Sequence, residues 1–217
     1  MDAIRAIARE AAAADPAHDF SHSLRVLANA LRIAQTEGGD ADVLTAAAYL
    51  HDIANLPKNH PDARLSSERS ANQAEAILRE HGFAEERIAK VKDAILCHSF
   101  SRGLAPQTLE GRIFQDADRL DALGAIGIAR TFAVGGAVQR PLYHREDPFL
   151  ESGRAPDDRA NTLDHFWIKL FKLGATMQTA TGKQLAADRI GRMQRFVAEL
   201  RDEIAPVQTK GLPPDDR

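Results

Sequence analysis

Apolar residues recur along most of this chain at the spacing of an α-helix. Leu24, Leu27, Leu31 and Ala34 follow one another at intervals of three or four residues, which places them on one helix face. Alanine-rich stretches add strong helix-forming tendency, and no segment alternates as a strand would. We therefore expect an all-α fold, a bundle of about eight or nine helices. The expected helices cover residues 2–14, 20–37, 41–53, 66–81, 84–98, 109–121, 123–134, 159–175 and 182–204.

Helix-ending residues separate these segments. Asp15-Pro16 ends the first, and glycines end two others at Gly38-Gly39 and Gly82. One long irregular segment covers about residues 135–156, and a loop of this length is either a lid or a plain surface connection. We expect a single domain over residues 1–204, with its core at about 15–145 and C-terminal helices at 159–204, and then a flexible tail at 205–217.

Composition and charge narrow the class of protein. The 217 residues are 44% hydrophobic, which suffices for one full core. The formal net charge of −3 gives no general attraction to a nucleic acid polymer or to an anionic membrane. A single cysteine, Cys97, excludes an intramolecular disulfide, and its apolar neighbours predict a buried thiol. No apolar run reaches the roughly 18 residues of a membrane span, so we expect a cytoplasmic protein.

Four side chains in the order His22, His51-Asp52 and Asp118 carry the chemistry that the sequence offers. Imidazole nitrogen and carboxylate oxygen together suit Mn²⁺, Fe, Co, Ni or Zn better than Mg²⁺, although Mg²⁺ stays a candidate. Neighbouring residues differ by about 100° around a helix, so His51 and Asp52 reach one ion only from a helix end. A cation held there lowers the pKa of a bound water and offsets the charge of a phosphoryl group.

The surroundings of these ligands resemble a known family. The blocks around His22 (DFSHSLRV) and Asp118 (QDADRLDA) resemble signatures of the HD-domain phosphohydrolase superfamily. The longer run from Gln115 to Phe132, with ILCHSF before it, resembles the YpgQ/YedJ-like branch over roughly residues 15–145. The resemblance implies an all-helical metal-dependent enzyme that cleaves a ribo- or deoxyribonucleoside triphosphate to monophosphate and pyrophosphate. The partner that it implies is therefore a small nucleotide.

Proton transfer needs a further side chain, and two carboxylates qualify. Glu68 is the stronger candidate for a general base, because a carboxylate near a metal-bound water can accept its proton. Its alternative role is that of a first-turn acid after the capping serines Ser66 and Ser67. Asp121, one turn after Asp118, is either a second catalytic carboxylate or a hydrogen-bond acceptor that orients a ligating histidine.

Four further residues are candidates for binding substrate: Lys58, Arg25, His18 and His98. Lys58 follows the His51-Asp52 pair, and Arg25 lies one turn after His22, where it can instead serve as a structural ion-pair partner. The resemblance gives His18 a role in substrate contact. His98 faces either the cleft, where an imidazolium suits phosphate, or a carbonyl at its helix end. Arg69 and Arg119 are expected to be solvated or structural.

Other interpretations of the same residues stay open at this stage. A phosphomonoesterase of the 5′-nucleotidase type needs the same metal, and a nucleotide-binding sensor would keep the metal with negligible turnover. A dinuclear enzyme would draw on the larger set His22, His51, Asp52, His60 or His81, His98 and Asp118. The apolar stripe that includes Phe166, Trp167 and Phe171 is typical of core packing or of a homodimer contact.

Overall fold

The computed structural model describes residues 1–12, 20–54, 56, 62–99 and 102–204. Within those ranges every regular element is a helix, as the sequence predicts, and no strand is present. The α-helices are α1 (Asp2–Ala11), α2 (Phe20–Glu37), α3 (Ala41–Leu50), α4 (Ser66–Glu80), α5 (Glu85–His98), α6 (Leu109–Asp121), α7 (Gly124–Ala137), α8 (His165–Ile168) and α9 (Ala180–Ile204), and two 3-10 segments are η1 (Ala63–Leu65) and η3 (Leu170–Thr176).

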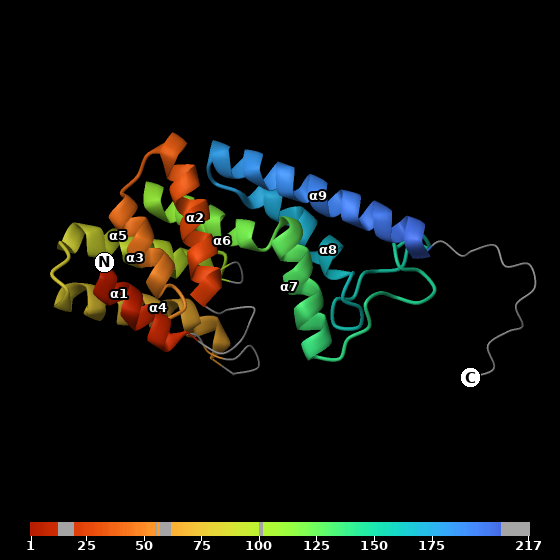
Figure 1. Cartoon of the computed structure of the whole chain (residues 1–217), viewed down its shortest axis with the longest axis horizontal. Helices are drawn as coiled ribbons and strands as arrows, with labels where there is room; N and C mark the ends of the chain where they lie inside the picture. The colour runs from red at the N-terminus through yellow and green to blue at the C-terminus, as the bar shows by residue number, and fades with distance from the viewer. Residues whose placement is uncertain (13–19, 55, 57–61, 100–101, 205–217) are drawn as a thin grey trace, which may run out of the picture.

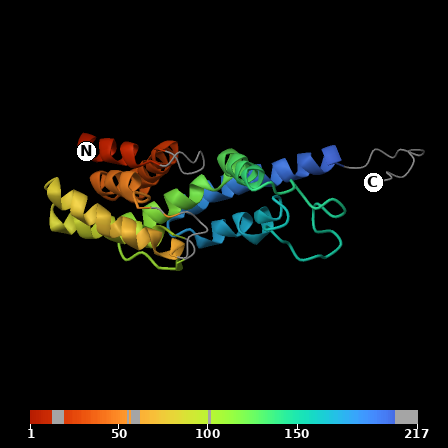
Figure 2. The same cartoon turned by 90° about the horizontal axis from the view of Figure 1, so that it is seen from below.

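The helices form two groups that α6 and α9 connect (Figure 1). α1 to α5 gather at one end, and α7, α8 and the second half of α9 lie at the other. The view turned by 90° places α6 between α2 and α5 (Figure 2), and it packs against both. α3 is buried on almost every side, because its Val43, Leu44 and Leu50 have no exposed surface. The core of the first group therefore surrounds α3 and the inner face of α6.

Several helix boundaries follow from local chemistry. The Asp40 carboxylate accepts hydrogen bonds from the backbone N–H groups of Asp42 and Val43 and so caps α3. Thr108 caps α6 in the same way, through the N–H of Gly111. Gly82 ends α4 with a φ of +73°, a conformation that glycine adopts without steric cost. Ser66 and Ser67, expected as capping residues of α4, lie instead inside its first turn.

The expected helix over 159–175 is wrong. The structure has only the four residues of α8 and the 3-10 segment η3 in that range. The backbone N–H groups of Thr162 and Leu163 donate to the carbonyls of Pro141 and Leu142 in the preceding loop. These bonds replace the intrahelical bonds that a longer helix would need. At the other end, Lys169 has a φ of −128°, which is outside the helical region and separates α8 from η3.

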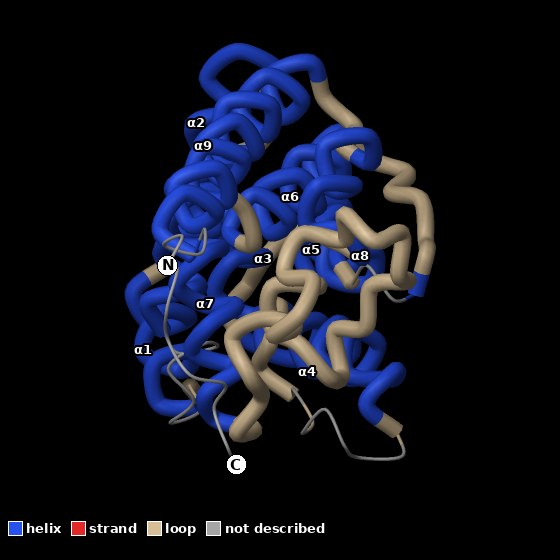
Figure 3. The backbone as a smooth tube through the Cα atoms, turned by 90° about the vertical axis from the view of Figure 1, so that its right-hand side faces the viewer, coloured by secondary structure: helices blue, strands red, loops and turns tan. Residues whose placement is uncertain are grey.

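Three smaller expectations also need correction. α1 ends at Ala11 rather than at residue 14, and α3 ends at Leu50, before a turn over 51–54. α7 continues through Gly135 to Ala137, although the sequence predicted a helix that ends at residue 134. A Cβ on Gly135 would lie 2.3 Å from the Thr162 hydroxyl oxygen, so this glycine permits a close approach of the loop to the helix. The loop itself occupies the front of the end-on view (Figure 3).

The aromatic stripe of the C-terminal part belongs to the core. Phe166 is fully buried, and its ring centroid lies 6.2 Å from those of both Phe132 and Phe196. This packing confirms the core alternative for Phe166. No single helix in the described ranges is long and apolar enough to cross a membrane, although α6 and α7 reach that length together, with a bend of 62° between them.

Candidate metal centre

Three helices and one turn bring the four expected metal ligands together. α2 begins at Phe20, so His22 lies in its first turn, and α6 supplies Asp118. His51 is the C-terminal cap of α3 and Asp52 lies in the turn beyond it, as expected for a pair that binds from a helix end. These residues come from parts of the chain up to 96 positions apart, so the fold as a whole builds the site.

The potential ligand atoms of this cluster lie within contact distance of one another. The Nε2 atoms of His22 and His51 are 3.2 Å apart, and His22 Nε2 is 3.4 Å from Asp118 Oδ1. Asp52 Oδ2 lies 3.3 Å from His51 Nε2 and 4.0 Å from His22 Nε2. His22, His51 and Asp118 each offer one potential ligand atom, and these three atoms all lie within 4.8 Å of one another. Ligands at about 2.0–2.2 Å from an ion stand at such separations from one another.

The outer nitrogen of each imidazole is anchored, which leaves the inner nitrogen to face the cluster. The Nδ1 of His51 lies 2.9 Å from the Ala48 carbonyl oxygen, and that of His98 lies 2.6 Å from the Ile95 carbonyl oxygen. A carbonyl oxygen only accepts hydrogen bonds, so Nδ1 carries the hydrogen and neutral Nε2 carries a lone pair. The Nδ1 of His22 lies 2.7 Å from Asp121 Oδ2. Such partners are typical of metal-bound histidines.

This donor set fits a divalent cation. With both outer nitrogens protonated, the neutral forms of His22 and His51 would direct two lone pairs at each other across 3.2 Å. A proton or a cation between these atoms removes that repulsion. Two imidazoles and two carboxylates are a mixed nitrogen and oxygen set of the kind that Mn²⁺, Fe, Co, Ni and Zn accept. His22, His51, Asp52 and Asp118 are the residues that would hold the ion.

The carboxylates and the imidazoles of the cluster shift the pKa values of one another in opposite directions. Burial opposes protonation of His22, but Asp118 and Asp121 outweigh it and raise its pKa to about 9. Burial likewise opposes protonation of His51, and the charge of Asp52 still raises its pKa. Burial disfavours ionisation of Asp52 and Asp118, yet the neighbouring histidines hold the pKa of both carboxyls well below the usual range. The carboxylates are therefore charged and able to bind a cation.

Among the described residues, the carboxylates of the cluster are more exposed than its imidazoles. His22 and His51 are 3% and 1% exposed, whereas the side chains of Asp52 and Asp118 are 25% and 23% exposed. The fully buried Phe114 ring packs edge-on against His51, with the centroids 5.5 Å apart. The imidazoles thus form the buried side of the cluster.

Asp121 lies behind the cluster rather than in it. Its side chain is 1% exposed, and its oxygens contact His22 Nδ1 and the guanidinium of Arg25, whose Nε is 2.7 Å from Oδ1. Burial disfavours the charged carboxyl, but His22, Arg25 and Arg130 lower its pKa nevertheless. This geometry favours the orienting alternative for Asp121 over a catalytic one, and the ion-pair alternative for Arg25 over substrate contact.

The other expected site residues have mixed placements. His98 directs Nε2 toward Asp52, 3.9 Å from Oδ1, so it faces the cluster and a helix carbonyl at once. Glu68 is half exposed and pairs with Arg102 at 3.1 Å. α4, which carries Glu68 in its first turn, is bonded to the segment after Asp52, because Ser66 Oγ accepts from the Leu56 N–H and Ser70 Oγ accepts from the Ala54 N–H. His18, Lys58 and His60 lie outside the described residues.

Arg130 is a neighbour of this site that the sequence pattern did not single out. It lies on α7, and its Nη1 donates to Asp121 Oδ2 at 2.7 Å. A spacing of nine residues matches no helical pair, so the contact arises only because α6 and α7 are bent relative to each other at Gly124, whose φ is +70°. His81, by contrast, is exposed and bonds to the Ile77 carbonyl at its own helix end, so it contributes nothing to the cluster.

Comparisons with known proteins identify the family of this chain. Residues 19–123 match the model of the HD domain family. The chain is 34% identical over 197 residues to the uncharacterised protein YpgQ of Bacillus subtilis (strain 168), covering 89% of this chain and 87% of that protein. The chain therefore belongs to the HD-domain phosphohydrolase superfamily, within its YpgQ-like branch.

Two solved structures show the same architecture. The crystal structure of B. subtilis YpgQ in complex with ADP has a TM-score of 0.72 at 31% identity, and the match covers 95% of each chain. An HD-superfamily hydrolase from Bacillus thuringiensis has a TM-score of 0.73 at 33% identity, over 94% of this chain and 97% of that one. The shared fold thus extends over nearly the full length of this chain.

Proposed function

We propose that this protein is a mononuclear metal-dependent phosphohydrolase that converts a ribo- or deoxyribonucleoside triphosphate into a monophosphate and pyrophosphate. The observation that carries the proposal is the cluster of His22, His51 and Asp118, whose potential ligand atoms all lie within 4.8 Å of one another, with Asp52 Oδ2 at 3.3 Å from His51 Nε2. Membership of a hydrolase superfamily supports the reaction class. The ADP complex of YpgQ supports a nucleotide as the substrate. We expect the protein to act in the cytoplasm.

Manganese is our first choice among the candidate ions, followed by cobalt, nickel and iron. The mixed ligand set favours these ions over Mg²⁺, which prefers oxygen ligands and retains its waters. When bound, such an ion supplies a Lewis acid that stabilises phosphoryl charge and generates a nucleophile at neutral pH. His22, His51, Asp52 and Asp118 would fix its position, and Asp121 would fix the orientation of His22.

We propose roles in proton transfer, charge compensation and positioning for the remaining candidate residues. Glu68 is our proposed general base, because Ser66 in the same first turn of α4 accepts a hydrogen bond from the Leu56 N–H, close after Asp52 in the chain. His98 faces Asp52 and is 12% exposed, so as a cation it would balance phosphate charge at the more exposed side of the cluster. Lys58 and His18 are proposed as further substrate contacts. Asp121 is already bonded to three side chains, so we assign it a positioning role.

The experiment is a hydrolysis panel with separated products. Nucleoside and deoxynucleoside mono-, di- and triphosphates are incubated with Mn²⁺, Co²⁺, Ni²⁺ or Mg²⁺, and pyrophosphate is resolved from phosphate. We expect pyrophosphate from triphosphates, and none from Asp52→Ala. Release of inorganic phosphate alone would instead identify a phosphomonoesterase. A metal-loaded protein that binds nucleotides without any product would contradict the proposal and identify a sensor.

A further inference from the structure

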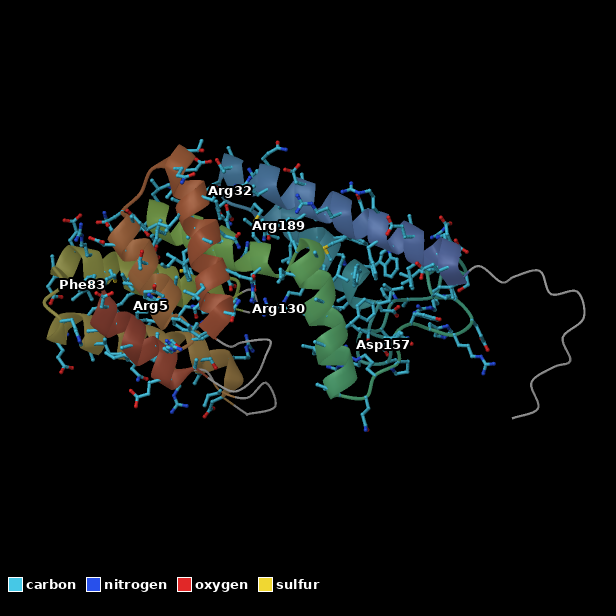
Figure 4. The ribbon with its side chains drawn as sticks, viewed as in Figure 1. Arg5, Arg32, Phe83, Arg130, Asp157 and Arg189 are labelled. Carbon is cyan, nitrogen blue, oxygen red and sulfur yellow. The ribbon has the colours of Figure 1, made fainter. Side chains whose placement is uncertain are left out.

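Arg130 connects α7 to the metal centre through Asp121. Its Nη1 lies 2.7 Å from Asp121 Oδ2, and the same carboxylate oxygen lies 2.7 Å from His22 Nδ1. Two hydrogen bonds through Asp121 thus connect the guanidinium to the His22 imidazole, whose other nitrogen, Nε2, faces the proposed metal position. Figure 4 labels Arg130 on the side of α7 that faces α2. A side chain at this position can reach a ligand of the metal without itself being a metal ligand.

Asp121 is shared by two arginines. Its side chain is 1% exposed and contacts the guanidinium groups of both Arg25 and Arg130. The carboxylates of Asp52 and Asp118 belong to the proposed metal centre instead. Guanidinium binds phosphate with a planar fork.

The two arginines use their donors differently. Arg25 commits both Nε and Nη2 to Asp121, at 2.7 and 3.0 Å. Arg130 uses only Nη1, which also donates to the Asp121 backbone carbonyl at 3.3 Å. Among the described residues, Nε and Nη2 of Arg130 have no acceptor, and the side chain is 22% exposed. Nε and Nη2 form one edge of the guanidinium fork, so that edge is available to a ligand.

The face of α7 that carries Arg130 is apolar and exposed on either side of that residue. Ile126, Ala133 and Ala137 lie one turn before, one turn after and two turns after Arg130, and all three are exposed. α7 packs on α9 and α6, and within the described part of the chain it has no comparable contact with α2 or α4. Exposed apolar side chains beside a guanidinium suit a nucleotide, whose phosphates are charged and whose base is largely apolar.

We propose that Arg130 binds a phosphate group of the substrate with the free edge of its guanidinium, while Asp121 holds the opposite corner in place. This inference rests on the proposed function, since it assigns a phosphate contact within the same site. The alternative is a purely structural arginine that caps the C-terminal carbonyl of α6. The Nη1 contacts alone would satisfy that role, and a lysine ammonium could replace them. Only phosphate binding needs the second edge of the fork.

The test compares Arg130→Lys and Arg130→Ala with wild type in the full-length protein. Manganese affinity is measured by electron paramagnetic resonance, and KM and kcat are measured for a nucleoside triphosphate. Binding of inorganic pyrophosphate to the manganese-saturated protein is measured by calorimetry. Arg79→Ala is the matched control, because Arg79 is an exposed arginine that pairs only with Glu75 and Glu85 on the far end of α4 and the start of α5.

We expect Arg130→Ala to weaken pyrophosphate binding and raise KM by about 10- to 100-fold, the range of a lost charged hydrogen-bond pair. Manganese affinity should change much less, and Arg130→Lys should fall between wild type and alanine because it keeps the charge and loses the fork. Arg79→Ala should match wild type. If Arg130→Ala does not fold, Arg130→Lys with an unchanged melting temperature decides the question by the same readouts.

Other outcomes separate this inference from the proposed function. Wild-type turnover with an unchanged KM in Arg130→Ala would overturn the role of Arg130 and leave the proposed function intact. An equal loss of manganese and pyrophosphate affinity would assign Arg130 to holding Asp121. If wild type hydrolyses no nucleotide, the proposed function fails, yet pyrophosphate binding that depends on Arg130 would still support the phosphate contact. A wild-type protein that binds no pyrophosphate would overturn it.

Discussion

Two buried aspartates, Asp121 at the end of α6 and Asp164 just before α8, contact arginines in different ways. Asp164 is fully buried and receives both Nη atoms of a single arginine, Arg154, at 2.6 and 2.8 Å. The backbone N–H of Asp157 adds a third bond. Asp121 instead receives two arginines and a histidine. Asp164 thus holds a loop, whereas Asp121 joins two guanidinium groups to a histidine of the proposed metal centre.

The difference also appears in what each carboxylate orders. Asp164 fixes the loop after α7, because Arg154 and Asp157 belong to that loop. Asp121 fixes a side chain, His22, whose other nitrogen faces three potential ligands. Removing Asp164 should therefore affect the stability of the fold, and removing Asp121 should affect the metal. Variants of the two aspartates therefore distinguish an effect on stability from an effect on metal binding.

The largest expected effect is that of Asp118→Ala. This change removes a carboxylate 3.4 Å from His22 Nε2 and leaves three of the four proposed ligands. We expect nucleotide hydrolysis to fall below detection, because substrate positioning and charge stabilisation both depend on the ion. Circular dichroism should show unchanged helicity, since the side chain is partly exposed. Activity near the wild-type level would contradict the assignment of Asp118 as a ligand.

Asp164→Ala should mainly reduce stability. It removes the carboxylate that binds both Nη atoms of the Arg154 guanidinium, which is 17% exposed and keeps only the longer contact of its Nε with Asp147 Oδ2 at 3.7 Å as an ion pair. Breaking a buried pair in this way costs roughly 3–5 kcal/mol of unfolding free energy. Urea denaturation measures the loss, and Asp158→Ala, which removes a partly exposed partner of His165, is a milder control. A loss of manganese affinity with normal stability would contradict a purely structural role for Asp164.

Asp121→Asn should have the opposite profile. An amide keeps the shape of the side chain but loses the charge that holds His22, Arg25 and Arg130 together. Removing such a partner of a ligating histidine lowers metal affinity by about 10- to 100-fold. Titration of the metal-free variant with Mn²⁺ measures the shift. A variant with wild-type manganese affinity but greatly reduced kcat would return Asp121 to the role of a catalytic carboxylate.

The contribution of the Arg154–Asp164 pair should depend on pH. Burial disfavours the charged Asp164, but Arg154 and the Asp157 N–H outweigh it and lower the pKa of the carboxyl. A depressed folded-state pKa gives stability that is complete above the unfolded value of about 3.9 and is lost as the pH falls through the folded value. The difference in unfolding free energy between wild type and Asp164→Asn should therefore shrink below about pH 3.9. A difference that grows on acidification would contradict this sign.

The smallest expected effect concerns Cys97. Its side chain is buried, and burial together with the nearby Asp93 raises the pKa of the thiol to about 11. The reactive thiolate is therefore scarce at neutral pH. We expect slow alkylation by iodoacetamide in the native protein and fast alkylation in urea. Fast native labelling, followed by mass spectrometry, would show that α5 opens at its C-terminal end.

Most helices could be predicted from the sequence because they depend on local spacing. A recognisable set of residues predicted the metal ligands, and the structure brings His22, His51 and Asp118 of that set close together. α2 and α6 match the expected ranges of 20–37 and 109–121. The helix expected over 159–175 does not form, because the backbone N–H groups of Thr162 and Leu163 donate to carbonyls of the preceding loop, at Pro141 and Leu142. No periodic pattern in the sequence reveals such bonds. Arg130 was missed for a similar reason: its contact with Asp121 depends on the bend between two helices.

The most direct test of the central claim follows metal binding and hydrolysis in one titration. Metal-free protein is mixed with a nucleoside triphosphate, Mn²⁺ is added in steps, and bound ion and released pyrophosphate are measured at each step for wild type and Asp118→Ala. We predict that activity rises in proportion to a single bound ion per chain and that the variant shows neither. Activity that begins only with a second ion, or full occupancy without pyrophosphate, would contradict a mononuclear hydrolase at His22, His51, Asp52 and Asp118.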